Sequence, residues 1–141
     1  MNRPLPIDTH STYGAMRMQI YAAGLNLTVG SVGMLPGITN GCYSETTHTI
    51  LIDRRLPYVA KRCTLVHELV HWQHGDDRCG IYETRTRRET ALLLIDRDRY
   101  AQAETTYDGD RWRIADELDV TIDVINDFQR ILAYERARHL S

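Results

Sequence analysis

The order of the predicted elements is the feature that most constrains the fold of this chain. Turn residues, among them Pro36-Gly37 and Asn40-Gly41, divide residues 25–53 into short segments that are typical of strands. Apolar residues recur at helical spacing in residues 10–24 and again from residue 58 onward. Strands that are followed by a run of helices, rather than alternating with them, favour an α+β fold.

The limits of the elements follow from local signals. We expect a small antiparallel sheet with strands at residues 27–29, 41–43 and 48–52. We expect helices at residues 10–24, 58–74, 84–100, 111–118 and 121–138. Pro57 suits the first turn of the second helix, and Gly75 suits the position just past its end. No linker or repeat divides the chain, so we expect one domain over residues 1–141, made of an N-terminal helix (1–24), a core (25–109) and a helical tail (110–141).

Composition excludes several classes of protein. A chain of 141 residues with 43% apolar and 26% charged residues is typical of one globular domain and excludes a disordered chain. A net charge of −2 gives no bulk attraction to nucleic acid. The longest apolar run, residues 91–95, is too short to span a bilayer, and the N-terminus lacks the apolar stretch of a signal peptide. We therefore expect a cytoplasmic protein without a membrane partner.

The helix expected at residues 58–74 contains the motif His67-Glu68-Leu69-Val70-His71. Histidines four residues apart lie on one face of a helix, so both imidazoles can reach one metal ion. Glu68 lies beside them, where its carboxylate can accept a proton from a water molecule at the metal. The motif predicts a metal site, and the type of ligand favours zinc.

The third ligand is predicted to be a carboxylate from the next helix. A third histidine is not expected, because Asp77 stands at the position that the histidine occupies in the extended motif. Glu89 is preferred because it shares a helix face with apolar residues three and four positions on, where an unpaired carboxylate is costly. Glu83 remains an alternative, although capping of the helix start would explain it, and Cys79 on the intervening loop is another.

These residues resemble the ImmA/IrrE family of zinc metallopeptidases of bacteria, phages and mobile elements. The resemblance covers residues 25–132 and is carried by segments 41–43, 49–53, 64–71, 88–91, 94–95 and 114–120. It implies a zincin-like metallopeptidase with a central HExxH helix and a helical C-terminal part. By position it implies His67, His71 and Glu89 as Zn²⁺ ligands and Glu68 as the catalytic base. Many members of the family have glycine where this chain has Val70.

The resemblance also implies a function and a protein partner. It implies a zinc-dependent endopeptidase that cleaves or inactivates a helix-turn-helix repressor, which relieves repression of phage, mobile-element or stress genes. The alternative is a non-proteolytic anti-repressor, a binding module with a structural zinc. The intact Glu68 favours catalysis, because a structural zinc needs no base. The donor to a developing oxyanion stays open among Tyr82, Tyr100 and Tyr107.

The tail offers a third possibility, because residues 115–131 are similar to a helix-turn-helix. Its charges argue against contact with DNA, since Asp116, Glu117, Asp119 and Asp123 would approach the phosphates. We therefore expect no direct binding of nucleic acid and interpret the tail as a helical lid or a partner-docking surface.

Overall fold

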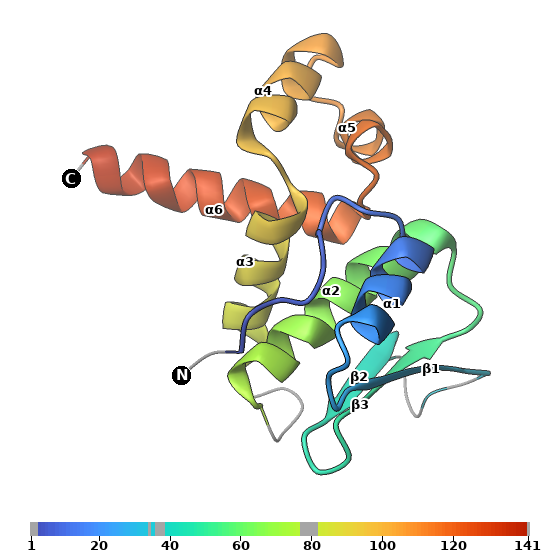
Figure 1. Ribbon diagram of the computed structural model, residues 1–141. Helices are drawn as coiled ribbons and strands as arrows, with labels where there is room; N and C mark the ends of the chain where they lie inside the picture. Colours follow the sequence, from blue (N-terminus) through green and yellow to red (C-terminus); the bar gives the residue numbers. More distant parts are fainter. Residues whose placement is uncertain (1–2, 34, 36–38, 77–81, 141) are drawn as a thin grey trace.

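The computed structural model describes residues 3–33, 35, 39–76 and 82–140, and these ranges form six helices and three strands (Figure 1). In chain order they are α1 (Tyr13–Ala22), β1 (Thr28–Val32), β2 (Gly41–Ser44), β3 (Thr49–Asp53), α2 (Tyr58–His74), α3 (Glu83–Leu94), α4 (Arg97–Thr106), α5 (Arg111–Leu118) and α6 (Ile122–Leu140). The α+β class is confirmed. Within the described ranges, no helix is both long enough and apolar enough to cross a membrane.

The sheet is mixed, so the prediction of an antiparallel sheet is wrong. Its strand order is β1-β3-β2, with β1 parallel to β3 and β2 antiparallel to β3. The short connection between β2 and β3 forms a hairpin, and β3 lies in the centre because β1 pairs with its other edge. β1 therefore does not pair with β2, which follows it in the sequence, but runs parallel to β3. Turn residues in the sequence mark where strands end, but they do not determine which strands pair. Because β3 is central in this order, β2 is an edge strand.

α2 is the centre of the hydrophobic core. Leu65, Val66 and Leu69 on α2 are fully buried, as are Ile50 and Ile52 on β3. Burial of each such side chain contributes about 1.5–3 kcal/mol relative to exposure. In Figure 1, α2 runs between α1 and the sheet on one side and α3 on the other. This packing leaves one face of α2 for the functional side chains.

The helix expected at residues 84–100 is two helices. α3 ends at Leu94, and the buried Ile95 adopts an extended backbone. Asp96 then caps α4 by accepting hydrogen bonds from the backbone N–H groups of Asp98 and Arg99, at 2.9 and 3.1 Å. Aspartate is among the preferred capping residues, and here its cap interrupts an otherwise continuous helical periodicity.

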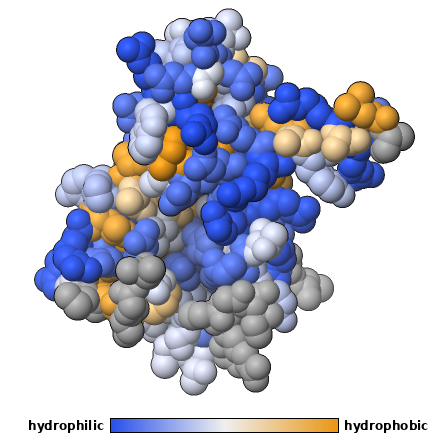
Figure 2. Space-filling model, turned by 180° about the vertical axis from the view of Figure 1, so that it is seen from behind, coloured by the Kyte–Doolittle hydropathy of each residue, from blue (hydrophilic) through white to orange (hydrophobic). Residues whose placement is uncertain are grey.

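α6 packs along α3 through its N-terminal half. Val124, Ile125 and Phe128 are buried there. The C-terminal half extends away from the body of the molecule, and Figure 2 shows hydrophobic surface at its projecting end. The turn between α5 and α6 is tied to α2 by the buried guanidinium of Arg62, which donates to the backbone carbonyl of Asp119.

Candidate metal centre

The two histidines of α2 meet a carboxylate from the first turn of α3. His67 and His71 lie one helical turn apart with ring centroids separated by 5.1 Å. Glu83 Oε1 lies 2.8 Å from His71 Nε2, and Glu83 Oε2 lies 3.1 Å from His67 Nε2. Each residue offers one ligand atom, and these atoms all lie within 4.8 Å of one another. His67, His71 and Glu83 can therefore hold a metal ion.

The structure does not bring Glu89 to this cluster, which corrects the preference for that residue. Glu89 Oε2 instead lies 2.6 Å from His74 Nε2. The preference assumed that the residues three and four positions after Glu89 face the core, but Leu92 is 42% exposed. The buried stripe of α3 is formed by Thr86, Thr90, Ala91 and Leu94. The alternative Glu83 lies in the cluster and could serve as the third ligand, and Cys79 lies outside the described residues.

Asp76 orients His71, and the sequence analysis missed this role. Its Oδ2 lies 2.7 Å from His71 Nδ1, and the same carboxylate is paired with Arg85. Gly75 ends α2 in the left-handed conformation (φ +67), which turns the chain back so that the Asp76 N–H bonds to the His71 carbonyl. A carboxylate on Nδ1 fixes the tautomer that leaves Nε2 free for a metal. The only signal in the sequence is an acidic residue directly after the C-terminal glycine.

The electrostatics of the cluster fit a cation. The two imidazoles hold the pKa of the Glu83 carboxyl well below its usual range. Burial lowers the pKa of His71, but hydrogen bonds to Glu83 and Asp76 outweigh it, and the net shift is upward. Two nitrogen donors and one carboxylate thus converge on a point where positive charge is stabilised, and this donor set suits zinc.

Glu68 is buried beside these residues but makes no equivalent contact. Its side chain lines the cleft at only 6% exposure, and burial raises its pKa. Within the described ranges, no hydrogen bond or ion pair engages its carboxylate, whereas Glu83 and Asp76 are both bound. A buried carboxylate of this kind is available to a water molecule or a substrate.

Gly41 allows β2 to approach this face of α2. A Cβ at residue 41 would lie 2.6 Å from Thr64 Cγ2 and 3.4 Å from Glu68 Cγ. A side chain there would displace Thr64 and crowd the backbone carbonyl of Leu51, 3.1 Å away. The glycine is therefore needed for close approach, and it brings the edge strand alongside Glu68.

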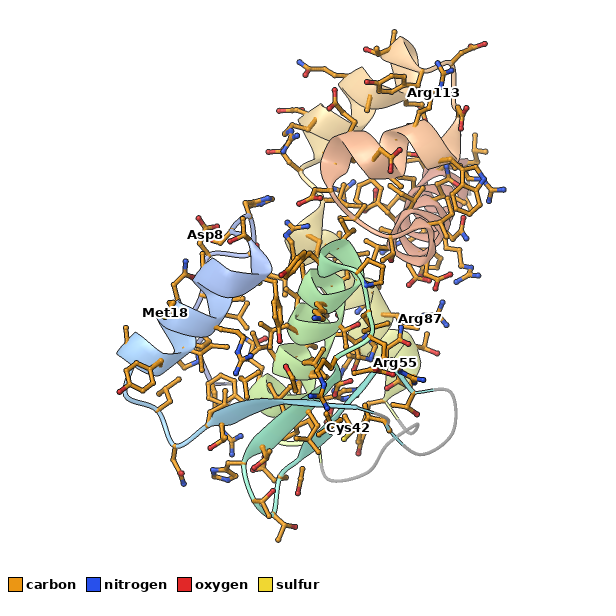
Figure 3. All side chains as sticks on the ribbon, turned by 90° about the vertical axis from the view of Figure 1, so that its right-hand side faces the viewer. Asp8, Met18, Cys42, Arg55, Arg87 and Arg113 are labelled. Atoms are coloured by element: carbon orange, nitrogen blue, oxygen red, sulfur yellow. The ribbon has the colours of Figure 1, made fainter. Side chains whose placement is uncertain are left out.

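A cleft of about 590 Å³ surrounds the cluster. Its floor is the face of α2 that carries the histidines, one wall is the edge strand β2, and the opposite wall is formed by α3 and the first half of α6. Figure 3 labels Cys42 and Arg87, which line the cleft from β2 and α3. The cleft is partly open to solvent.

Comparison of the sequence with protein-family models and with curated proteins finds no match to either. Inferences about function therefore depend on the site itself and on the resemblance of its motifs.

The tyrosines considered as oxyanion donors do not line the cleft in the described structure. Tyr100 is buried and contacts Gln129 and Glu104, and Tyr107 donates toward Glu117. Tyr82 directly precedes α3, and the guanidinium of Arg85 lies 4.6 Å from the centre of its ring.

Proposed function

We propose that the protein is a zinc-dependent endopeptidase of the ImmA/IrrE type. The observation that carries the proposal is the buried, unengaged carboxylate of Glu68 next to the His67–His71–Glu83 set. Catalytic zinc sites use three protein ligands and keep one position for water or substrate, whereas structural sites are closed by four. Two histidines and one carboxylate are a ligand set of the catalytic kind.

The chemistry would be hydrolysis of a peptide bond. When zinc is bound, it supplies Lewis acidity to the peptide carbonyl and acidifies water. Glu68 takes a proton from the attacking water as the water oxygen bonds to the carbonyl carbon. Glu68 then passes that proton to the nitrogen as the C–N bond breaks, which leaves a carboxylic acid and an amine. The raised pKa of Glu68 helps the carboxyl to hold the proton between the two transfers.

Asp76 and Arg85 support this reaction without touching the substrate. Asp76 keeps His71 in the tautomer that presents Nε2 to the site, and Arg85 holds the Asp76 carboxylate in place through an ion pair. His71 is thereby held rigidly, whereas Glu68 is free to exchange a proton.

A helix-turn-helix repressor is the substrate that we propose, and its cleavage would relieve repression of phage, mobile-element or stress genes. The support is the resemblance of residues 25–132 to that family. The open cleft beside an edge strand also suits an extended segment of another protein. Asp123 adds a carboxylate to the cleft wall, which favours a basic segment.

The Glu68→Gln variant tests catalysis against simple sequestration of the repressor. The amide keeps the size of the side chain but cannot act as a base, so zinc content and fold should survive. Cleavage of the repressor encoded nearest to this gene, followed by mass spectrometry, should fall by about 10²–10⁴-fold. Glu104→Gln is the matched control, because Glu104 is exposed, lies outside the helical tail and does not line the cleft. If Glu68→Gln relieves repression as well as the wild type does, the protein is a binding module with a structural zinc.

A further inference from the structure

Arg87 is the cationic side chain on the wall of the cleft next to the metal centre. It follows Glu83 by one turn of α3, so the two side chains project from the same face of the helix. Among the described residues that line the cleft, Arg87 is the only arginine or lysine. Arg87 is therefore the permanently charged cation that the cleft wall presents beside these three side chains.

Asp127 of α6 holds the Arg87 guanidinium in a fixed orientation. Arg87 Nε and Nη2 donate to Asp127 Oδ2 and Oδ1 at 3.1 and 3.0 Å, which is a bidentate arrangement. Asp127 is mostly buried and also accepts a hydrogen bond from Arg130 Nη1 at 2.8 Å. The carboxylate is thus anchored from both sides, and the guanidinium plane is set by α6.

The remaining N–H groups of Arg87 are available to a ligand in the cleft. No hydrogen bond from Nη1 to another residue occurs in the part of the chain that the structure describes, and the side chain is 46% exposed. Tyr43 also lines the cleft, but its hydroxyl donates to Glu45 and accepts from Arg3. Arg87 is therefore the better placed donor to an anionic oxygen.

We propose that Arg87 binds the carbonyl oxygen of the peptide bond beside the metal centre and stabilises the negative charge that develops on it. A guanidinium is permanently charged and presents its donors in one plane, which suits the binding of an oxyanion. Asp127 is then a positioning residue that acts through Arg87. This inference depends on the proposed peptidase function, but its first consequence, affinity for a tetrahedral oxyanion, can be measured without any turnover.

Binding of inorganic phosphate to the Co²⁺-loaded protein tests the proposal, because phosphate presents anionic oxygens to the metal centre. The visible absorption of Co²⁺ reports the binding. Arg87→Met should raise the phosphate Kd about tenfold or more, the loss expected for a charge-assisted hydrogen bond. Arg87→Lys should retain part of the affinity, and Asp127→Asn should be intermediate. Arg88→Met is the matched control, because it removes the same charge from an exposed neighbour on α3 that does not line the cleft.

Imidazole serves as a second probe, because it binds a metal without presenting an anionic oxygen. Its Kd should be the same in wild type, Arg87→Met and Arg88→Met, and Co²⁺ content should not change. If the phosphate Kd of wild type and Arg87→Met agree within about twofold, or if Arg88→Met weakens phosphate binding equally, the proposal is wrong. Once a substrate that the protein cleaves is identified, Arg87→Met should lower kcat by about 10²–10³-fold with little change in KM.

Failure of this proposal is distinguishable from failure of the peptidase function. The proposed peptidase function would be wrong if the wild-type protein took up no Co²⁺, or if Glu68→Gln cleaved the substrate as well as the wild type does. The proposal for Arg87 alone would be wrong if metal uptake and Glu68-dependent cleavage were both intact but the phosphate affinity did not depend on Arg87.

Discussion

Replacing the carboxylates of Glu83 and Glu89 by amides, one at a time, tests which of them holds the metal. Glu83 contacts both Nε2 atoms of the cluster, whereas Glu89 contacts His74 outside it. Structural zinc sites with four ligands are worth about 10–16 kcal/mol, or roughly 3 kcal/mol for each ligand. At about 1.4 kcal/mol per tenfold change, Glu83→Gln should weaken zinc binding by about 10²-fold.

Glu89→Gln is the internal control for that measurement. It breaks a partly exposed ion pair, and such pairs contribute about 0–1 kcal/mol to stability. Its zinc affinity should therefore match the wild type within about twofold. The assay is competition with a chromophoric chelator at fixed pH, with thermal unfolding of the metal-free proteins as the check on folding. Greater zinc loss in Glu89→Gln than in Glu83→Gln would refute the assignment of Glu83.

Cys79→Ser is a third variant for the same zinc-binding experiment. It lies outside the described residues, so a contribution from this thiol has to be measured. We expect Cys79→Ser to bind zinc like the wild type. A loss as large as that of Glu83→Gln would mean a site closed by four protein ligands, which is the structural arrangement and would favour the binding module.

Three further predictions follow from the contacts around the site and the sheet. Asp76→Asn should weaken zinc binding by about 10–100-fold with the fold retained, and an unchanged chelator competition curve would contradict the role of Asp76. Because the pKa of His71 is raised in the metal-free protein, zinc must displace a proton there. The zinc affinity should therefore rise by up to about tenfold per pH unit below that pKa, with proton release seen by calorimetry in two buffers. Arg55 lowers the pKa of Asp53 from 3.8 to about 2, so this carboxylate stabilises the fold above the ordinary pKa. That stability is lost as the pH falls from about 4 to 2, and denaturant titrations of Asp53→Asn should show a flatter loss over this window.

The helix that carries the metal ligands could be predicted from the sequence because its limits are set locally. The expected range of residues 58–74 is the range of α2, with Pro57 before it and Gly75 in the left-handed conformation after it. The expected range 111–118 likewise is that of α5. Once α2 has formed, its geometry alone places His67 and His71 one turn apart, whatever packs around them.

The third candidate ligand could not be predicted in the same way, because it depends on the rotation of α3 about its own axis where it packs against α2. A run of apolar residues gives a helix several possible buried faces, and the run after Glu89 does not reveal that Leu92 is exposed. The buried stripe includes Thr86 and Thr90, whose hydroxyls bond to the backbone carbonyls of Tyr82 and Thr86. Threonines with satisfied hydroxyls can occupy a core position, so a search for apolar residues alone chooses the wrong face. The pairing of β1 with β3 was missed for a similar reason, since it is a long-range choice.

The first half of α6 contributes to the site through its packing rather than through contact with DNA. α5 and α6 are joined by a short turn in which Asp119 adopts the left-handed conformation. Val124 and Phe128 are buried where α6 packs on α3, and Asp127 lines the cleft. This half of α6 forms part of the wall of the candidate metal site. The same packing lets Asp127 anchor the Arg87 guanidinium. The tail therefore forms the wall of a cleft whose floor is the helix with the HExxH motif.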